Sequence, residues 1–164
     1  MLIMLIDGRM QMDSKIQEQV IKYANEFRDA MEEAKEHGEF QSRLDLENFP
    51  KGACGIASDL LGEYLREHGI KSTYVCGWKI SSLPNETSQS HAWLIVDGLI
   101  VDITGDQFQK DTEYYSYNQR VYVGEKDLFH TLFKVCLNQV HQFRGLTSGE
   151  DKHYYRIIKR YCSY

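Results

Sequence analysis

The first long stretch of the chain places its apolar residues at the spacing of an amphipathic helix. In "DSKIQEQVIKYANEFRDAMEEAKEHG", every third or fourth residue is apolar, and these residues share one helix face. Ser14 and Gln17 form a capping box at its start, and Gly38 is a suitable stop at its end. We therefore predict a helix over about 14–37. The preceding "MLIMLIDGRM" is an apolar run that we expect to form a first strand or an apolar N-terminal arm.

A second helical pattern begins at a cysteine that lies between small residues. The stretch 39–53 has no sustained period and ends in proline and glycine, so it predicts a loop. From about Cys54 to His68 the helical period returns, and Gly69 ends it. The buried face of this helix is predicted to consist of Ile56, Leu60, Leu61, Tyr64 and Leu65.

The middle of the chain changes to the patterns of β-strands. "IKSTYVCGWKI" predicts a strand, and the polar "SSLPNETSQS" predicts a loop. "HAWLIVDGLIVDITGDQF" predicts two strands joined at Asp97-Gly98, a dipeptide typical of tight hairpins. After a less regular stretch over 107–119, "RVYVG" predicts one more strand.

Two helices are predicted to complete the chain. The first covers about Asp127 to His141 and the second about Ser148 to Tyr161. The first should bury Leu128, Leu132, Val135 and Val140, and the second Tyr154, Ile157, Ile158 and Tyr161. Helices and strands together predict an α+β fold in a single domain over 1–164, with a core at about 48–125, because no linker or repeat divides the sequence.

Composition restricts the classes of function. The chain has 164 residues and a formal net charge of −5, which argues against a nucleic-acid partner because such proteins need a basic surface. Its N-terminal apolar run is too short for a membrane span or a convincing signal sequence, so we expect a cytoplasmic protein with reduced thiols and no membrane partner. The cysteines and histidines have no metal-binding spacing, so we expect neither a metal nor a cofactor.

The hairpin brings a histidine and an acid to the same face of the sheet. If Asp97 and Gly98 form a two-residue turn, Trp93 lies opposite Asp102, and His91 becomes a diagonal neighbour of Asp102. Asp97 is about 20 Å away along the strand, too far to orient the His91 ring. Asp106 has the right parity but follows the expected strand end, so we keep it as a reserve.

Cys54 is the cysteine with the surroundings of a nucleophile. A helix N-terminus and a neighbouring imidazolium both stabilise a thiolate, and glycines on both sides allow substrate to approach. His91 can accept the thiol proton, and Asp102 can fix the His91 tautomer. By contrast, Cys76, Cys136 and Cys162 lie in apolar strand or helix patterns, where a cysteine is a small hydrophobic residue.

The motifs "GACGIASDLL", "SHAWLIV" and "LIVDITGDQF" resemble the Cys, His, Asp order of the transglutaminase-like branch of the papain-like superfamily. The resemblance covers roughly residues 50–108. It implies a central helix bearing Cys54, packed on an antiparallel sheet with flanking helices. It further implies that Cys54 is the nucleophile, His91 the general base and acid, and Asp102 the orienting group.

Two departures from the family pattern and one candidate oxyanion donor accompany that resemblance. Gly55 stands where many members have an aromatic residue, and Ile103 replaces a proline of the family pattern. Papain-like enzymes use a side-chain amide six residues before the cysteine as an oxyanion donor, a position held here by Asn48. Tyrosines 114, 115 and 117 are expected to pack across the sheet or to form a cleft wall.

We therefore expect a cysteine hydrolase or acyltransferase that forms an acyl-enzyme at an amide, with a protein or peptide substrate. If water accepts the acyl group, the enzyme is a peptidase or a glutamine deamidase. If an amine accepts it, the enzyme is a transglutaminase. The alternatives are a non-catalytic protein-binding module on the same fold and a thioester-dependent acyltransferase similar to arylamine acetyltransferases. The N-terminal helix either covers the cleft as a lid or packs against the sheet.

Overall fold

The structure, a computed structural model, describes residues 2–79, 88–110 and 117–163. Within these residues the chain forms five α-helices and an antiparallel sheet of six strands, so the predicted α+β class is confirmed. The helices are α1 (Leu2–Glu36), α2 (Leu44–Glu47), α3 (Cys54–Glu67), α4 (Leu128–Thr131) and α5 (Gly149–Lys159). The strands are β1 (Thr73–Lys79), β2 (Gln89–Val96), β3 (Leu99–Asp102), β4 (Tyr122–Gly124), β5 (Lys134–Val135) and β6 (His141–Gln142).

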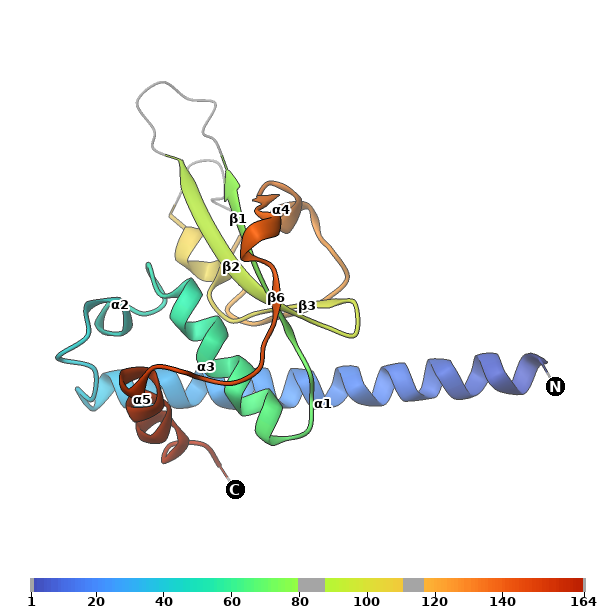
Figure 1. Ribbon diagram of the computed structural model, residues 1–164, viewed down its shortest axis with the longest axis horizontal. Helices are drawn as coiled ribbons and strands as arrows, with labels where there is room; N and C mark the ends of the chain where they lie inside the picture. The colour runs from blue at the N-terminus through green and yellow to red at the C-terminus, as the bar shows by residue number, and fades with distance from the viewer. Residues whose placement is uncertain (1, 80–87, 111–116, 164) are drawn as a thin grey trace.

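Helix α1 is longer than its periodic segment predicts. It begins at Leu2, so the expectation of a strand or arm over the first ten residues is wrong. Leucine and methionine favour helix and no proline interrupts the segment, so the helix continues upstream of the Ser14 capping box. Its end is as predicted, because Gly38 follows with a φ of 74°. Figure 1 shows the N-terminal end of α1 extending past the rest of the molecule.

The sheet is built around the β2–β3 hairpin. Its strand order is β4-β3-β2-β1-β5, and β6 pairs with the same strand as β5, namely β1. The predicted turn is confirmed: Val96 pairs with Leu99, while Asp97 and Gly98 have φ values of 50° and 82°. Strand β4 pairs with β3, and at the end of this ladder Asp102 lies opposite Tyr122.

The region after residue 127 is the main error of the sequence-based prediction. A helix over 127–141 is wrong: α4 is one turn, followed by β5, a short 3₁₀ helix (η2, Leu137–Gln139) and β6. Both short strands pair with β1 on the side away from β2, where the backbone groups of β1 would otherwise be unpaired. The predicted buried face is wrong for Leu128 and Leu132, which are 86 % and 45 % exposed, whereas Val135 and Val140 are partly buried against the smaller core cluster.

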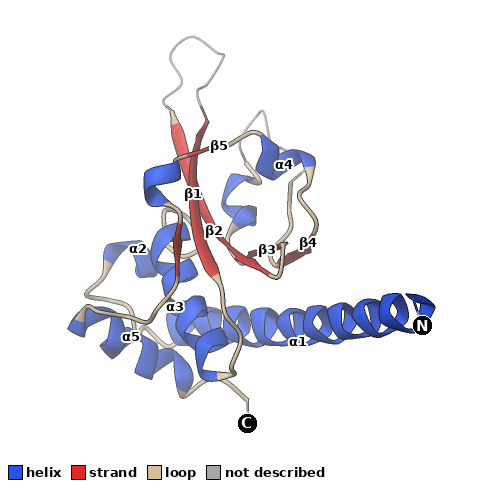
Figure 2. Ribbon diagram, turned by 45° about the vertical axis from the view of Figure 1, so that its right-hand side comes forward, coloured by secondary structure: helices blue, strands red, loops and turns tan. Residues whose placement is uncertain are grey.

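The helices and the sheet share the main hydrophobic core. Helix α3 packs against β1 and β2, and α1 packs against α3, α5, β3 and β4, so α1 belongs to the core of the fold. Figure 2 shows α1 and α5 lying across one end of the long β1–β2 pair. The predicted buried faces of α3 and α5 are confirmed, with Tyr161 only partly buried. A smaller aromatic cluster contains Trp93, Phe108, Phe129 and Phe133.

Within the described residues, the structure contains no helix with both the length and the apolar character needed to cross a membrane.

Candidate active site

His91 and Asp102 form a buried pair on the central hairpin. His91 lies near the start of β2 and Asp102 at the end of β3, and their side chains are 0 % and 1 % exposed. The His91 Nε2 atom lies 2.7 Å from Asp102 Oδ2. The prediction that these two side chains share a face and reach each other is therefore confirmed. Since Nε2 faces the carboxylate, the His91 Nδ1 atom is left for other partners.

Asp102 is held as a carboxylate from several sides. Its Oδ1 accepts hydrogen bonds from the backbone N–H of Thr104 at 2.8 Å and from the Thr104 hydroxyl at 3.2 Å. Its Oδ2 lies 3.1 Å from the Nε2 of a second histidine, His130. Burial alone raises the pKa of Asp102, but the charge of His91 and the hydrogen bonds from His130 and His91 hold it well below its usual range. Asp102 is thus a fixed anion that orients His91.

His130 is a buried residue of the site that the sequence does not indicate. It lies in α4, is 0 % exposed, and its Nδ1 atom lies 2.6 Å from Asp127 Oδ1. Its two ring nitrogens therefore face two carboxylates, those of Asp127 and Asp102. Both contacts are hydrogen bonds only when both nitrogens carry hydrogen. His130 then links Asp102 to the N-terminus of α4, where the Asp127 carboxylate also accepts from the His130 backbone N–H at 2.9 Å.

Replacing His130 by phenylalanine is expected to lower the free energy of unfolding by about 1–3 kcal/mol, because a ring of similar shape removes one side-chain donor from each of two carboxylates, Asp102 and Asp127. Urea denaturation measures this change. His130→Gln is the matched variant: its amide can donate to Asp102 but cannot serve Asp127 at the same time, so it should recover part of the loss. Equal stability of the phenylalanine variant and the unmodified protein would contradict the anchoring role of His130.

Cys54 begins helix α3. The N-cap residue, Ala53, provides no side-chain hydrogen bond to the first turn, so the positive end of the helix is open to an anion at this point. Cys54 is partly exposed. Two buried thiols differ from Cys54: burial raises the pKa of Cys76, and burial raises the pKa of Cys162 to about 11.

The electrostatics of Cys54 and His91 favour a thiolate beside an imidazolium. Burial alone raises the pKa of the Cys54 thiol, but the hydrogen bond with His91 and the charge of that ring lower it below its usual value, as does a hydrogen bond from the Ala92 backbone. Burial likewise lowers the pKa of His91, yet the charge and hydrogen bond of Asp102, with those of Cys54, raise it to about 9. Each group therefore favours the charged form of the other.

Gln107 is a second residue that sequence patterns do not indicate. It lies in the 3₁₀ helix η1 (Gly105–Phe108) that follows β3. Its Nε2 atom lies 3.3 Å from His91 Nδ1 and donates to the Thr104 carbonyl at 3.0 Å, while its Oε1 accepts from the Gly52 backbone N–H at 3.2 Å. Gln107 thus bridges the segment that precedes Cys54 and the segment that follows Asp102.

Asn48, the sequence-based oxyanion candidate, is engaged elsewhere. It is exposed at the C-terminal end of α2, and its Nδ2 donates to the Leu44 carbonyl at 2.9 Å. It lines a surface depression with Leu44 and Lys51, whereas Gln107 lines a neighbouring one. The oxyanion role of Asn48 stays a prediction.

The remaining sequence candidates take structural positions. The reserve acid, Asp106, forms an ion pair with buried Arg28, with 2.8 Å between its Oδ2 and the guanidinium. Tyr117 stacks on Phe129, with ring centroids 3.7 Å apart. Tyrosines 114 and 115 lie outside the described residues.

A metal ion is the main chemical alternative for the buried cluster. Among the described residues, His91, Asp102 and His130 can each offer one ligand atom, and these atoms lie within 4.8 Å of one another. Ligand atoms around a tetrahedral zinc lie roughly 3.3 Å apart, given metal–nitrogen bonds of about 2.0 Å. The separation of 2.7 Å between His91 Nε2 and Asp102 Oδ2 fits a shared proton better.

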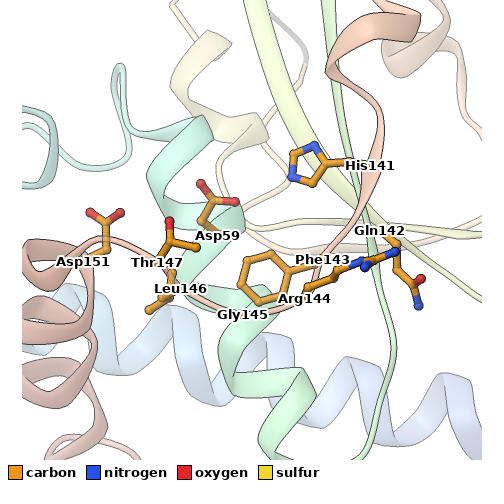
Figure 3. A pocket seen from close by; sticks show the side chains of 9 residues that line it. All are labelled: Asp59, His141, Gln142, Phe143, Arg144, Gly145, Leu146, Thr147 and Asp151. Atoms are coloured by element: carbon orange, nitrogen blue, oxygen red, sulfur yellow. The ribbon is translucent and has the colours of Figure 1, made fainter.

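The surface beside the site is hollowed. A depression of about 430 Å³ is lined by Lys51, Gly52, Gln89, Ser90, Gln107, Phe108 and Lys110, and Gln107 joins it to His91. A separate cavity of about 390 Å³ lies along α3 and the segment after β6, where Asp59 and His141 line it (Figure 3). Burial raises the pKa of Asp59 to about 6. Cys54, His91 and Asp102 do not line this second cavity.

Comparison of this chain with protein-family models, curated proteins and solved structures finds no match. The resemblance to transglutaminase-like enzymes therefore depends on the motifs of the sequence alone.

Proposed function

We propose that this protein is a thiol-dependent enzyme that forms an acyl-enzyme on Cys54 and acts on an amide bond of a protein or peptide. The observation that carries the proposal is the buried His91–Asp102 pair, with 2.7 Å between Nε2 and Oδ2, and the Cys54 thiol at the start of α3 hydrogen-bonded to the same ring. Burial raises the pKa of this thiol, but the hydrogen bond and charge of His91 lower it below its usual value. A structural cysteine has no need of a depressed pKa, and buried Cys76 and Cys162 have raised values. The helix, hairpin and motif order also support a papain-like or transglutaminase-like arrangement.

The proposed chemistry follows from the tautomer that Asp102 imposes. The His91 Nε2–H donates to the carboxylate, so the Nδ1 lone pair can accept the Cys54 proton. The sulfur then attacks the carbonyl carbon and forms a tetrahedral oxyanion, which backbone N–H groups at the start of α3 can stabilise.

Collapse of this intermediate breaks the carbon–nitrogen bond, and His91 gives its proton to the departing amine. The acyl group remains on Cys54 as a thioester. A water molecule, deprotonated by His91, then attacks the thioester. The carbon–sulfur bond breaks, a carboxylic acid is released, and the proton held by His91 returns to the Cys54–His91 pair. An amine in place of water would give a new amide by the same steps, and the three groups serve both acceptors equally.

The test is to trap the acyl-enzyme with an activated ester. On exposure to p-nitrophenyl acetate, the unmodified protein should release one rapid equivalent of p-nitrophenolate and gain one acetyl group on the Cys54 peptide, detected by mass spectrometry. Cys54→Ala should lose both signals. Cys136→Ala is the matched control because Cys136 is also partly exposed, and it should keep both.

A rapid phase that survives in Cys54→Ala would contradict the proposal, because another group would then be the nucleophile. Absence of a rapid phase from the unmodified protein would also contradict it and would favour the non-catalytic binding module, for which the surface offers an apolar depression of about 620 Å³ lined by Trp78 and Leu132 among others. A rapid phase seen only with an acyl thioester donor would favour the acyltransferase.

A further inference from the structure

The depression beside His91 contains a polar side chain that the proposed steps do not use. Gln107 lines this depression and is only partly exposed. It stands near the end of the "LIVDITGDQF" motif, in which Asp102 is the predicted site residue. Figure 1 shows the η1 turn that carries it, coloured yellow, beside the N-terminal end of α3.

The orientation of the Gln107 amide is fixed by its neighbours. A backbone N–H, that of Gly52, points at one end of the amide, so that end must be the oxygen. A carbonyl, that of Thr104, lies 3.0 Å from the other end, so that end must be the nitrogen. The NH₂ group therefore faces the His91 Nδ1 atom, 3.3 Å away, on the side where the ring meets Cys54.

One hydrogen of this NH₂ group is used by Thr104, and the other has only a conditional partner. It can donate to His91 Nδ1 only while that nitrogen has a free lone pair. In the thiolate–imidazolium pair that the electrostatics favour, Nδ1 already carries the proton of Cys54, so this amide hydrogen has no acceptor on the ring. It is then available to the oxyanion that forms when the sulfur attacks.

We infer that Gln107 is a catalytic residue whose side-chain amide donates a hydrogen bond to the oxyanion, opposite the N–H groups at the start of α3. The inference rests on the proposed function and specifies the oxyanion donor of the same site. An interaction that appears only when negative charge develops stabilises the transition state more than the bound substrate, and therefore accelerates the reaction. Gln107 supplies the chemistry that the sequence assigns to Asn48, from the opposite side of the cysteine in the chain.

The test compares two reactions of the same sulfur in Gln107→Ala. Acylation of Cys54 by p-nitrophenyl acetate forms an oxyanion, whereas alkylation by iodoacetamide displaces iodide without forming one. The variant should therefore acylate about 100-fold more slowly than the unmodified protein, and its alkylation rate should be unchanged. Gln107→Glu keeps an oxygen for Gly52 but removes the donor, so it should also acylate slowly. Gln109→Ala is the control, since Gln109 is exposed at the end of η1, and both of its rates should be unchanged.

Each other outcome overturns the inference. Equal loss of acylation and alkylation would mean that Gln107 acts by positioning His91 or Cys54. Unchanged acylation would remove Gln107 from the oxyanion site. If the unmodified protein alkylates normally at Cys54 but does not acylate there, the proposed function and its oxyanion donor are both refuted. This result is distinguishable from failure of the Gln107 inference alone, because it is seen in the unmodified protein without any variant.

Discussion

Replacing His91 by alanine is expected to slow the alkylation of Cys54 by iodoacetamide about 10- to 100-fold near pH 6.5. In the unmodified protein, the hydrogen bond and charge of His91 lower the pKa of the thiol, against burial, which raises it. The variant removes the first two causes and retains burial. The pKa of Cys54 should then rise to its ordinary range or above, and only a small fraction of thiolate remains at this pH.

The pH dependence of Cys54 alkylation should show in which direction His91 shifts the pKa of the thiol. The His91 pKa of about 9 means that the ring is charged throughout the neutral range, so it stabilises the thiolate there. Alkylation of the unmodified protein should therefore stay fast until the pH falls through the lowered pKa of Cys54. In His91→Ala the same decline should appear at a higher pH.

Two controls keep this result interpretable. His153→Ala removes an exposed histidine on α5 and should leave the profile unchanged. Buried Cys162 reports folding, because its labelling would increase if the variant unfolded. Identical profiles for His91→Ala and the unmodified protein would mean that His91 does not activate Cys54.

Replacing Arg28 by alanine is expected to lower the free energy of unfolding by about 3 kcal/mol, because the change removes a buried cation from the Asp106 carboxylate, which is 18 % exposed, and the donor from the buried Ile103 carbonyl. Arg28 lies on α1 and is 2 % exposed. Its guanidinium binds both carboxylate oxygens of Asp106, at 2.9 and 2.8 Å, and donates to the Ile103 carbonyl and to Glu32. Ile103 precedes the η1 turn that carries Gln107, and Asp106 lies within that turn, so the same change should also loosen the segment that follows Asp102.

Urea denaturation measures the loss, and Arg66→Ala is the matched control. Arg66 also pairs with a carboxylate, that of Glu63, but it is exposed, so its removal should hardly move the unfolding midpoint. A similarly small change for Arg28→Ala would contradict the view that α1 is bound into the core through this arginine.

The sequence predicts the parts of the site that have a local signal. The Asp97-Gly98 turn sets the strand register, and the register places His91 beside Asp102, so this pair can be derived from one dipeptide and the two-residue strand period. The start of α3 follows in the same way from the helical period that begins at Cys54. Each of these predictions needs only residues that are neighbours in the chain or across one hairpin.

The parts that the sequence does not predict depend on distant contacts. His130 reaches Asp102 because the chain after β4 packs its aromatic residues into the cluster around Trp93. The apolar residues that give this segment its apparent helical period are divided between that cluster and the surface, so the period is misleading. Gln107 becomes recognisable only when Gly52 and His91 lie beside it, since a glutamine in a short turn has no pattern of its own.

The central claim is that His91 activates Cys54 as a nucleophile. The most direct measurement is the pH profile of Cys54 alkylation in the unmodified protein, followed peptide by peptide for all four cysteines by mass spectrometry. The account predicts that Cys54 reacts fastest, with a midpoint below the ordinary thiol value of about 8.5. A Cys54 midpoint at or above that value, or faster labelling of partly exposed Cys136 at acidic pH, would contradict it.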